Sequence, residues 1–131
     1  MHTIPGQIIP VITAMFSSLF STCLLANSYY PKPKEHWYQD VWCKGKGGQV
    51  EFKLNDGRRV DCLTAEHAIE VEFARKWSEA IGQSLDYSML TGKKAGVVLI
   101  LQRDSDHTYW HRIQKLKDHY QLPITLWKLG P

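Results

Sequence analysis

A continuous aliphatic run, Gly96-Val97-Val98-Leu99-Ile100-Leu101, limits the fold of this chain more than any other segment. Such a run is typical of a strand that is covered on both faces. Segments with helical periodicity lie on either side of it, at residues 74–90 and at about 106–120, and a last strand is predicted at 124–128. Strand–helix–strand steps of this kind favour parallel neighbours with right-handed crossovers, as in an α/β protein.

The segments before this run predict a helix and three strands. A short helix is expected at 35–43, ahead of a glycine-rich stretch. Alternating polar and apolar residues predict strands at 49–54 and 58–63, and the Asn55-Asp56-Gly57 turn between them predicts a hairpin. A third strand follows at 67–73. The order predicts an αβββαβ core with an added C-terminal helix and strand.

The N-terminal segment differs from the rest of the chain because residues 1–31 contain no Asp, Glu, Lys or Arg. Its apolar stretch, 11–26, is shorter than the roughly 20 residues of a membrane-spanning helix. We therefore expect a signal peptide at 1–26, a linker at 27–34 and one domain at 35–131, exported to the periplasm or secreted. The missing basic start and the large Leu24 before the cleavage point favour a buried helix or an interfacial anchor instead. Acylation of Cys23, as in a lipoprotein, is a weaker alternative.

Export would change the meaning of the cysteines. Without Cys23, the pair Cys43 and Cys62 is a candidate disulfide in an oxidising compartment, closing a loop of about 20 residues. In a reducing compartment, the same two residues would be small buried hydrophobic side chains. The spacing does not suggest a zinc site.

Acidic residues on the predicted second and third strands are the main candidates for chemistry. Glu70 and Glu72 point to one face of their strand because side chains alternate, and Asp61 lies on the strand before. Carboxylates held together repel one another, so they need a cation, a proton or water. Together they would form an oxygen-ligand site for Mg²⁺ or Mn²⁺. The alternative is a solvent-facing edge strand that binds nothing.

These features resemble the PD-(D/E)XK nuclease superfamily. The resemblance rests on the strand order, on Asp61, on the acidic third strand and on Gln83-Ser84-Leu85-Asp86-Tyr87, which is similar to the QxxxY helix of the RecB-like exonuclease branch. It covers residues 35 to about 101 and implies a restriction-endonuclease-like fold. It also implies that a divalent cation, Mg²⁺ or Mn²⁺, activates a water that attacks a phosphodiester of DNA or RNA.

The resemblance assigns roles to individual residues. Asp61 would be the central metal-binding acid, Glu70 the acid of the (D/E)xK element, and Glu35 a further metal contact on the first helix. Gln83 and Tyr87 would help to position the substrate from the second helix.

The lysine of the (D/E)xK element is replaced, because Glu72 stands at its position. Some members carry that lysine on the following helix, where Lys76 is the candidate. Lys76, Gln83 and Tyr87 are seven and four residues apart, which places them on one helical stripe. Glu72 would add a metal contact or pair with Lys76. The alternative is that the stripe is simply a solvated helix face.

The sequence therefore predicts a divalent-metal-dependent nuclease. The alternatives are an exported non-catalytic module that keeps the nuclease fold and binds nucleic acid or another partner, and another metal-dependent hydrolase on the same scaffold. Trp37, Trp42 and Trp77 are expected to be core residues. His107 and His111 have the spacing of two zinc ligands but lack an evident third. The net charge of +3 does not by itself identify a nucleic-acid binder, and the oligomeric state stays open.

Overall fold

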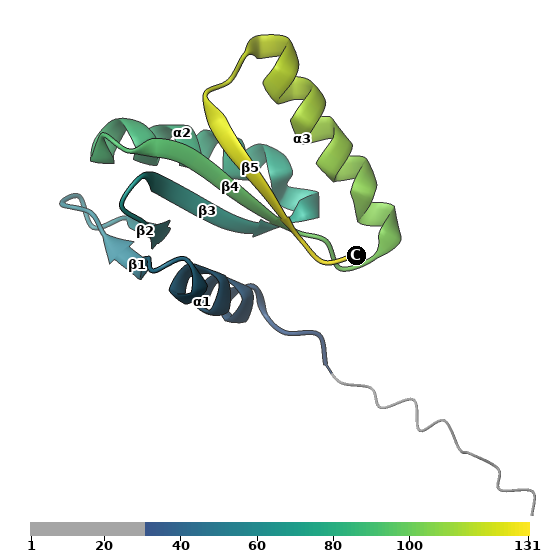
Figure 1. Ribbon diagram of the computed structural model, residues 1–131, viewed down its shortest axis with the longest axis horizontal. Coiled ribbons are helices and arrows are strands. Elements are labelled where there is room, and N and C mark those ends of the chain that lie inside the picture. The colour runs from purple at the N-terminus through teal and green to yellow at the C-terminus, as the bar shows by residue number, and fades with distance from the viewer. Residues whose placement is uncertain (1–30) are drawn as a thin grey trace, which may run out of the picture. The chain divides into compact units, whose positions relative to one another are not determined.

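The computed structural model describes residues 31–131, in which a five-stranded sheet is accompanied by three α-helices (Figure 1). The predicted signal peptide at 1–26, Cys23 and the first residues of the predicted linker lie outside the described residues. The elements follow the predicted order, with two short 3-10 turns, η1 and η2, before the second and third helices. Their bounds are α1 Glu35–Gly45, β1 Gln49–Lys53, β2 Arg59–Leu63, β3 His67–Phe73, η1 Ala74–Lys76, α2 Trp77–Thr91, β4 Lys94–Ile100, η2 Asp104–Asp106, α3 His107–Tyr120 and β5 Ile124–Leu129.

The sheet has the order β1-β2-β3-β4-β5, and its two halves differ in direction. β1, β2 and β3 pair antiparallel, starting with the predicted hairpin, in which Val50 lies opposite Cys62. Gly57 takes a φ of +89° in the turn, a conformation that a residue without a Cβ adopts readily. β3, β4 and β5 pair parallel through α2 and α3. The mixed α/β architecture is therefore confirmed, including the added C-terminal helix and strand.

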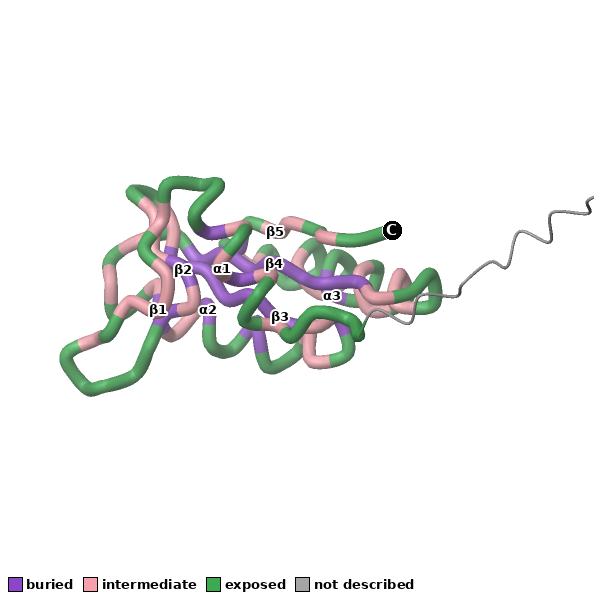
Figure 2. The backbone as a smooth tube through the Cα atoms, turned by 90° about the horizontal axis from the view of Figure 1, so that it is seen from below, coloured by how far each residue is buried: buried purple, intermediate pink, exposed green. Residues whose placement is uncertain are grey.

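The two faces of the sheet carry separate cores. Val97 and Leu99 of β4 pack with α2 and α3, whereas Val98 and Ile100 belong to the core beneath α1. All four are at most 1% exposed. Buried residues follow one another along β3 and β4 through the centre of the molecule (Figure 2). This confirms that the aliphatic run is a strand covered on both faces.

The ladder between β2 and β3 is short, and this positions the site described below. Only two residue pairs, Cys62 with Ile69 and Leu63 with Ala68, join the two strands, although β3 continues to Phe73. Beyond these pairs, the Asp61 carboxylate accepts a hydrogen bond from the Val71 backbone N–H at 2.9 Å. A side chain thus replaces the backbone acceptor at the point where the strands separate.

A disulfide joins Cys43 of α1 to Cys62 of β2, and both cysteines are fully buried. It turns the stripe of Glu35, Gln39 and Cys43, spaced four residues apart, toward the sheet. Trp37 lies away from that stripe and is 53% exposed, so the expectation that it is a core residue is wrong. Trp42 and Trp77 do pack against the two cores.

Candidate functional site

Glu70 and Glu72 are buried acidic residues in the middle of the sheet. They are 5% and 8% exposed, and they alternate with Ile69 and Val71, which point into the core beneath α1. The alternative of a solvent-facing edge strand is wrong because β3 lies between β2 and β4. A carboxylate buried in this way needs a partner, a proton or a cation.

Asp61 and Glu70 meet across the place where β2 and β3 separate. Their carboxyl groups are in hydrogen-bond contact, so they share a proton at neutral pH. Burial raises the pKa of Asp61 to about 6, against the lowering effect of its hydrogen bond from Val71. Burial, followed by the charge of Asp61, raises the pKa of Glu70 to about 9. The pair therefore keeps one proton at neutral pH, and Glu70 has the more strongly raised pKa.

A second contact of the same kind links α1 to β3. The Glu35 and Glu72 carboxyl groups are in hydrogen-bond contact, and burial together with Glu72 raises the pKa of Glu35 to about 8. Lys76 Nζ lies 3.5 Å from Glu72 Oε2 and partly offsets the raised pKa of Glu35. Glu72, which replaces the lysine of the (D/E)xK element, thus pairs with Lys76, one of the two roles expected of it.

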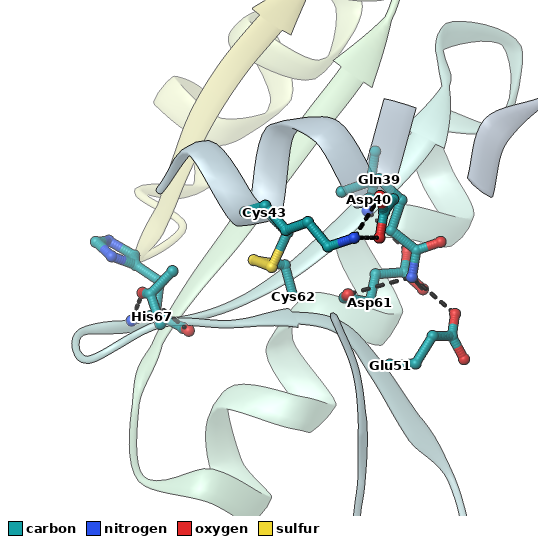
Figure 3. Close-up of a disulfide and its surroundings, with 10 residues drawn as sticks. Gln39, Asp40, Cys43, Glu51, Asp61, Cys62 and His67 are labelled. Atoms are coloured by element: carbon teal, nitrogen blue, oxygen red, sulfur yellow. Dashed lines mark hydrogen bonds and ion pairs between the residues drawn. A yellow bond between two sulfur atoms is a disulfide. The ribbon is translucent and has the colours of Figure 1, made fainter. Parts of the chain in front are cut away.

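Gln39 joins the cluster from α1, although the sequence motifs do not point to it. Its amide Nε2 donates to Glu51 Oε1 at 2.7 Å and to the Asp61 backbone and carboxylate oxygens at 3.1 and 3.2 Å (Figure 3). Gln39 is only 3% exposed. Its place midway between Glu35 and Cys43 on one helical face is the signal that could have identified it. Gln39 holds two acidic side chains in place without adding a charge.

The resulting cluster has one unpartnered atom. Glu70 Oε1 is buried and has no hydrogen-bond partner among the described residues. Tyr87, 8% exposed, lies on the same side, and burial followed by the charge of Glu70 raises its pKa. Because buried oxygens in folded proteins are normally satisfied, Glu70 Oε1 marks a place where a ligand would lower the free energy of the site.

The chemistry of the donors suits a hard divalent cation, since the side chains are carboxylates from α1, β2 and β3. In residues 31–131, however, no three His, Cys, Asp or Glu side chains are arranged as a ready metal site. Two of the four acids hold a proton at neutral pH because of their raised pKa values. A cation would have to displace these protons and bring the oxygens together.

The structure brings together five of the seven residues named from the sequence, and Tyr87 lies beside them. The five are Glu35, Asp61, Glu70, Glu72 and Lys76. Gln83 is exposed on α2, and its side chain makes no hydrogen bond to another described residue. His67 lies at the far end of β3, where its ring bonds Thr125 Oγ1 at 3.0 Å and packs on Trp127. His107 and His111 touch each other on α3, without a third ligand among the described residues.

Comparison with known proteins gives one local relationship. The chain matches no protein-family profile and no solved structure. A KilA-N domain-containing protein of Acanthamoeba polyphaga mimivirus is 33% identical over 70 residues, which are 53% of this chain and 28% of the viral protein. The chain therefore spans less than a third of that relative. Among residues 31–131, no helix is long and apolar enough to cross a membrane.

Proposed function

We propose that this domain binds DNA or RNA and hydrolyses its phosphodiester bonds with Mg²⁺ or Mn²⁺. The ion would be held by Glu35, Asp61, Glu70 and Glu72, which we call the carboxylate cluster. The observation that carries the proposal is the buried, unpartnered Glu70 Oε1 beside Asp61, at the separation of β2 and β3. Carboxylates held there against their mutual repulsion favour a cation over water. The local match to a KilA-N domain-containing protein supports the nucleic-acid-binding part of the proposal.

The residues of the chain divide the work of such a reaction. Asp61, Glu70, Glu72 and Glu35 would hold the cation, which supplies a more acidic water and charge neutralisation when bound. Water adds to phosphorus, the bond to the leaving oxygen breaks, and the proton lost by water ends on that oxygen or in solvent. Lys76 provides the positive charge nearest to the acids, where it would stabilise the charge that develops on the phosphate. Tyr87 and Gln83 would position the substrate from α2.

Cleavage assays on the full, oxidised chain test this proposal. Labelled single-stranded DNA, double-stranded DNA and RNA are incubated with Mg²⁺, Mn²⁺ or chelator. We expect metal-dependent cleavage that falls about 100-fold or more in Glu70→Gln, because the variant keeps the shape of the site but loses a ligand charge. Glu66→Gln removes an exposed acid at the start of β3 and should leave the rate unchanged. Equal cleavage by wild type and Glu70→Gln contradicts the assignment of the site.

A second candidate function is a module that binds nucleic acid without cutting it. Two observations favour it. Lys76, the candidate for the lysine of the (D/E)xK element, is engaged in an ion pair with Glu72, and residues 31–131 contain no three converging metal ligands. The same assay separates the two candidates. Strand binding with no cleavage in either metal, by protein shown to be folded, identifies the binding module.

We also propose that the chain is exported to the periplasm or secreted. The charge-free residues 1–31 and the Cys43–Cys62 disulfide support this, because disulfides persist mainly in oxidising compartments. The full chain expressed in a bacterium should be recovered outside the cytosol. The intact mass of the recovered protein should be that of a chain that starts at Asn27. Recovery from the cytosol with residues 1–26 retained contradicts export.

A further inference from the structure

A pocket rich in arginine lies just beyond the end of β3, the strand that carries Glu70 and Glu72. It has a volume of about 380 Å³ and is bounded by the residues that follow β3 and β4 and by the first turns of α3. Arg75 comes to it from η1, Arg103 from the loop between β4 and η2, and Arg112 from α3, and Ser105 and Thr108 add hydroxyl groups. We call these three arginines and the space between them the arginine pocket.

The charges in the arginine pocket do not cancel. Arg75, Arg103 and Arg112 are all exposed, and none forms an ion pair with another residue of the described range 31–131. The one acid in the wall, Asp106, already accepts a hydrogen bond from the Gln102 backbone N–H at 2.8 Å. Three guanidinium groups around one cavity therefore face solvent with an excess of positive charge, which attracts an anion.

The arginine pocket lies at the end of β3, the strand that carries Glu70 and Glu72. Arg75 comes three residues after Glu72, so the two Cα atoms are at most about 11 Å apart. Lys76, the residue after Arg75, pairs with Glu72, whereas Arg75 lies over the Phe73 ring at 5.3 Å and lines the pocket. The pocket also lies beyond the carboxyl ends of the parallel strands β3 and β4, where α/β sheets commonly bind ligands.

We propose that the arginine pocket binds a phosphate group of the nucleic acid whose neighbouring phosphodiester lies at the carboxylate cluster. Guanidinium groups match phosphate oxygens in pairs, and three of them would hold one phosphate from several sides. The proposal rests on the proposed function for the identity of the ligand. It adds a subsite that fixes where along the strand the carboxylates act.

Binding measured without cleavage tests the subsite. The full chain and an Arg75→Ala, Arg112→Ala double variant are titrated with a fluorescent single-stranded 12-nucleotide DNA in chelator at several salt concentrations. We expect the double variant to bind at least about 10-fold more weakly, and its salt slope to fall by up to about 0.7, the contribution of one neutralised phosphate on a single strand. Lys94→Ala removes an exposed charge at the opposite end of β4 and should change neither quantity beyond a small uniform loss.

Two further arms make the result specific. A double Arg→Lys variant keeps the charge but not the paired geometry, so it should recover the salt slope and only part of the affinity. The titrations are repeated with a 5′-phosphorylated strand. A larger loss on that strand identifies a terminal phosphate in the pocket, and an equal loss identifies an internal phosphodiester; both support the subsite.

The outcomes separate the subsite from the proposed catalysis. An unchanged affinity and salt slope in the double Arg→Ala variant overturn the subsite, even when the wild-type chain cleaves. A lost slope in that variant supports the subsite, even when no metal restores cleavage and the catalytic proposal fails. A wild-type chain that binds no strand overturns both. Circular dichroism of each variant confirms that it is folded.

Discussion

At the scale of single residues, burial dominates the protonation of Glu70. Removal from water is the largest cause of its raised pKa, ahead of the charge of Asp61. A carboxyl group with a higher pKa in the folded chain contributes its full stability below its unfolded pKa, about 4.5, and loses it as the pH rises toward about 9. Burial of Glu70 thus links the stability of the metal-free protein to pH.

We expect the free energy of unfolding in chelator to fall as the pH rises from 5 to 8.5, with Glu70 contributing up to about 1.4 kcal/mol for each pH unit. Glu70→Gln stays neutral throughout this range, so it should remove the contribution of Glu70 to the slope and exceed the wild-type stability at pH 8, while Glu35 and Asp61 keep the rest of the pH dependence. Urea unfolding at pH 5, 7 and 8.5 measures both effects. The exposed control Glu66→Gln should follow wild type, and a Glu70→Gln profile parallel to wild type would refute the explanation.

Gln39 gives a second prediction at this scale. Its amide bonds Glu51 and Asp61, so Gln39→Leu leaves these acceptors with fewer partners in a buried place. We expect the free energy of unfolding to drop by about 1–3 kcal/mol. Gln114→Leu, on the exposed face of α3, is the matched control and should change it by less than about 0.5 kcal/mol. Equal losses in the two variants would mean that the amide hydrogen bonds do not stabilise the cluster.

At the scale of elements, periodicity was enough to predict the strands and helices. Alternation marks β1 to β3 and the apolar run marks β4, and the bounds of these strands differ from the predicted ones by two residues at most. Asp61, Glu70 and Glu72 could be placed together for the same reason. The inward face of α1 could not be predicted in this way. The disulfide and Gln39 fix which face lies against the sheet, although the opposite face, with Trp37 and Val41 both more than half exposed, is more apolar.

The attachment of α1 to the sheet yields a prediction at Gly48, just before β1. A Cβ at this position would lie 2.6 Å from Cys62 Sγ and 2.7 Å from Cys43 Sγ. Gly48→Ala should therefore lower the free energy of unfolding of the oxidised protein by about 1–3 kcal/mol. Gly45→Ala, whose Cβ would meet nothing within 4 Å, is the control. Similar denaturation midpoints for both variants would show that α1 and the disulfide can move to accommodate the added Cβ without a loss of stability.

At the scale of the whole molecule, the carboxylate cluster lies where the two halves of the sheet join. Asp61 belongs to the antiparallel half, whereas Glu70 and Glu72 lie on β3, which begins the parallel half. Glu35 reaches the same place from α1. This convergence depends on the early separation of β2 from β3, a long-range feature that no local pattern encodes. A ligand bound there would hold both halves and α1 together, so it would stabilise the complete fold.

We therefore expect Mn²⁺ to raise the free energy of unfolding of the full chain, by about 2.7 kcal/mol when the free ion is at 100 times its Kd. The rise should be larger at pH 8 than at pH 5, because the ion competes with the protons on Glu70 and Glu35. Thermal unfolding followed by circular dichroism over a Mn²⁺ series measures it. Glu70→Gln should lose most of the gain, while Glu66→Gln keeps it. An equal gain in all three proteins would mean that the ion binds elsewhere. A wild-type melting temperature unaffected by Mn²⁺ would mean that the cluster holds protons and binds no metal ion.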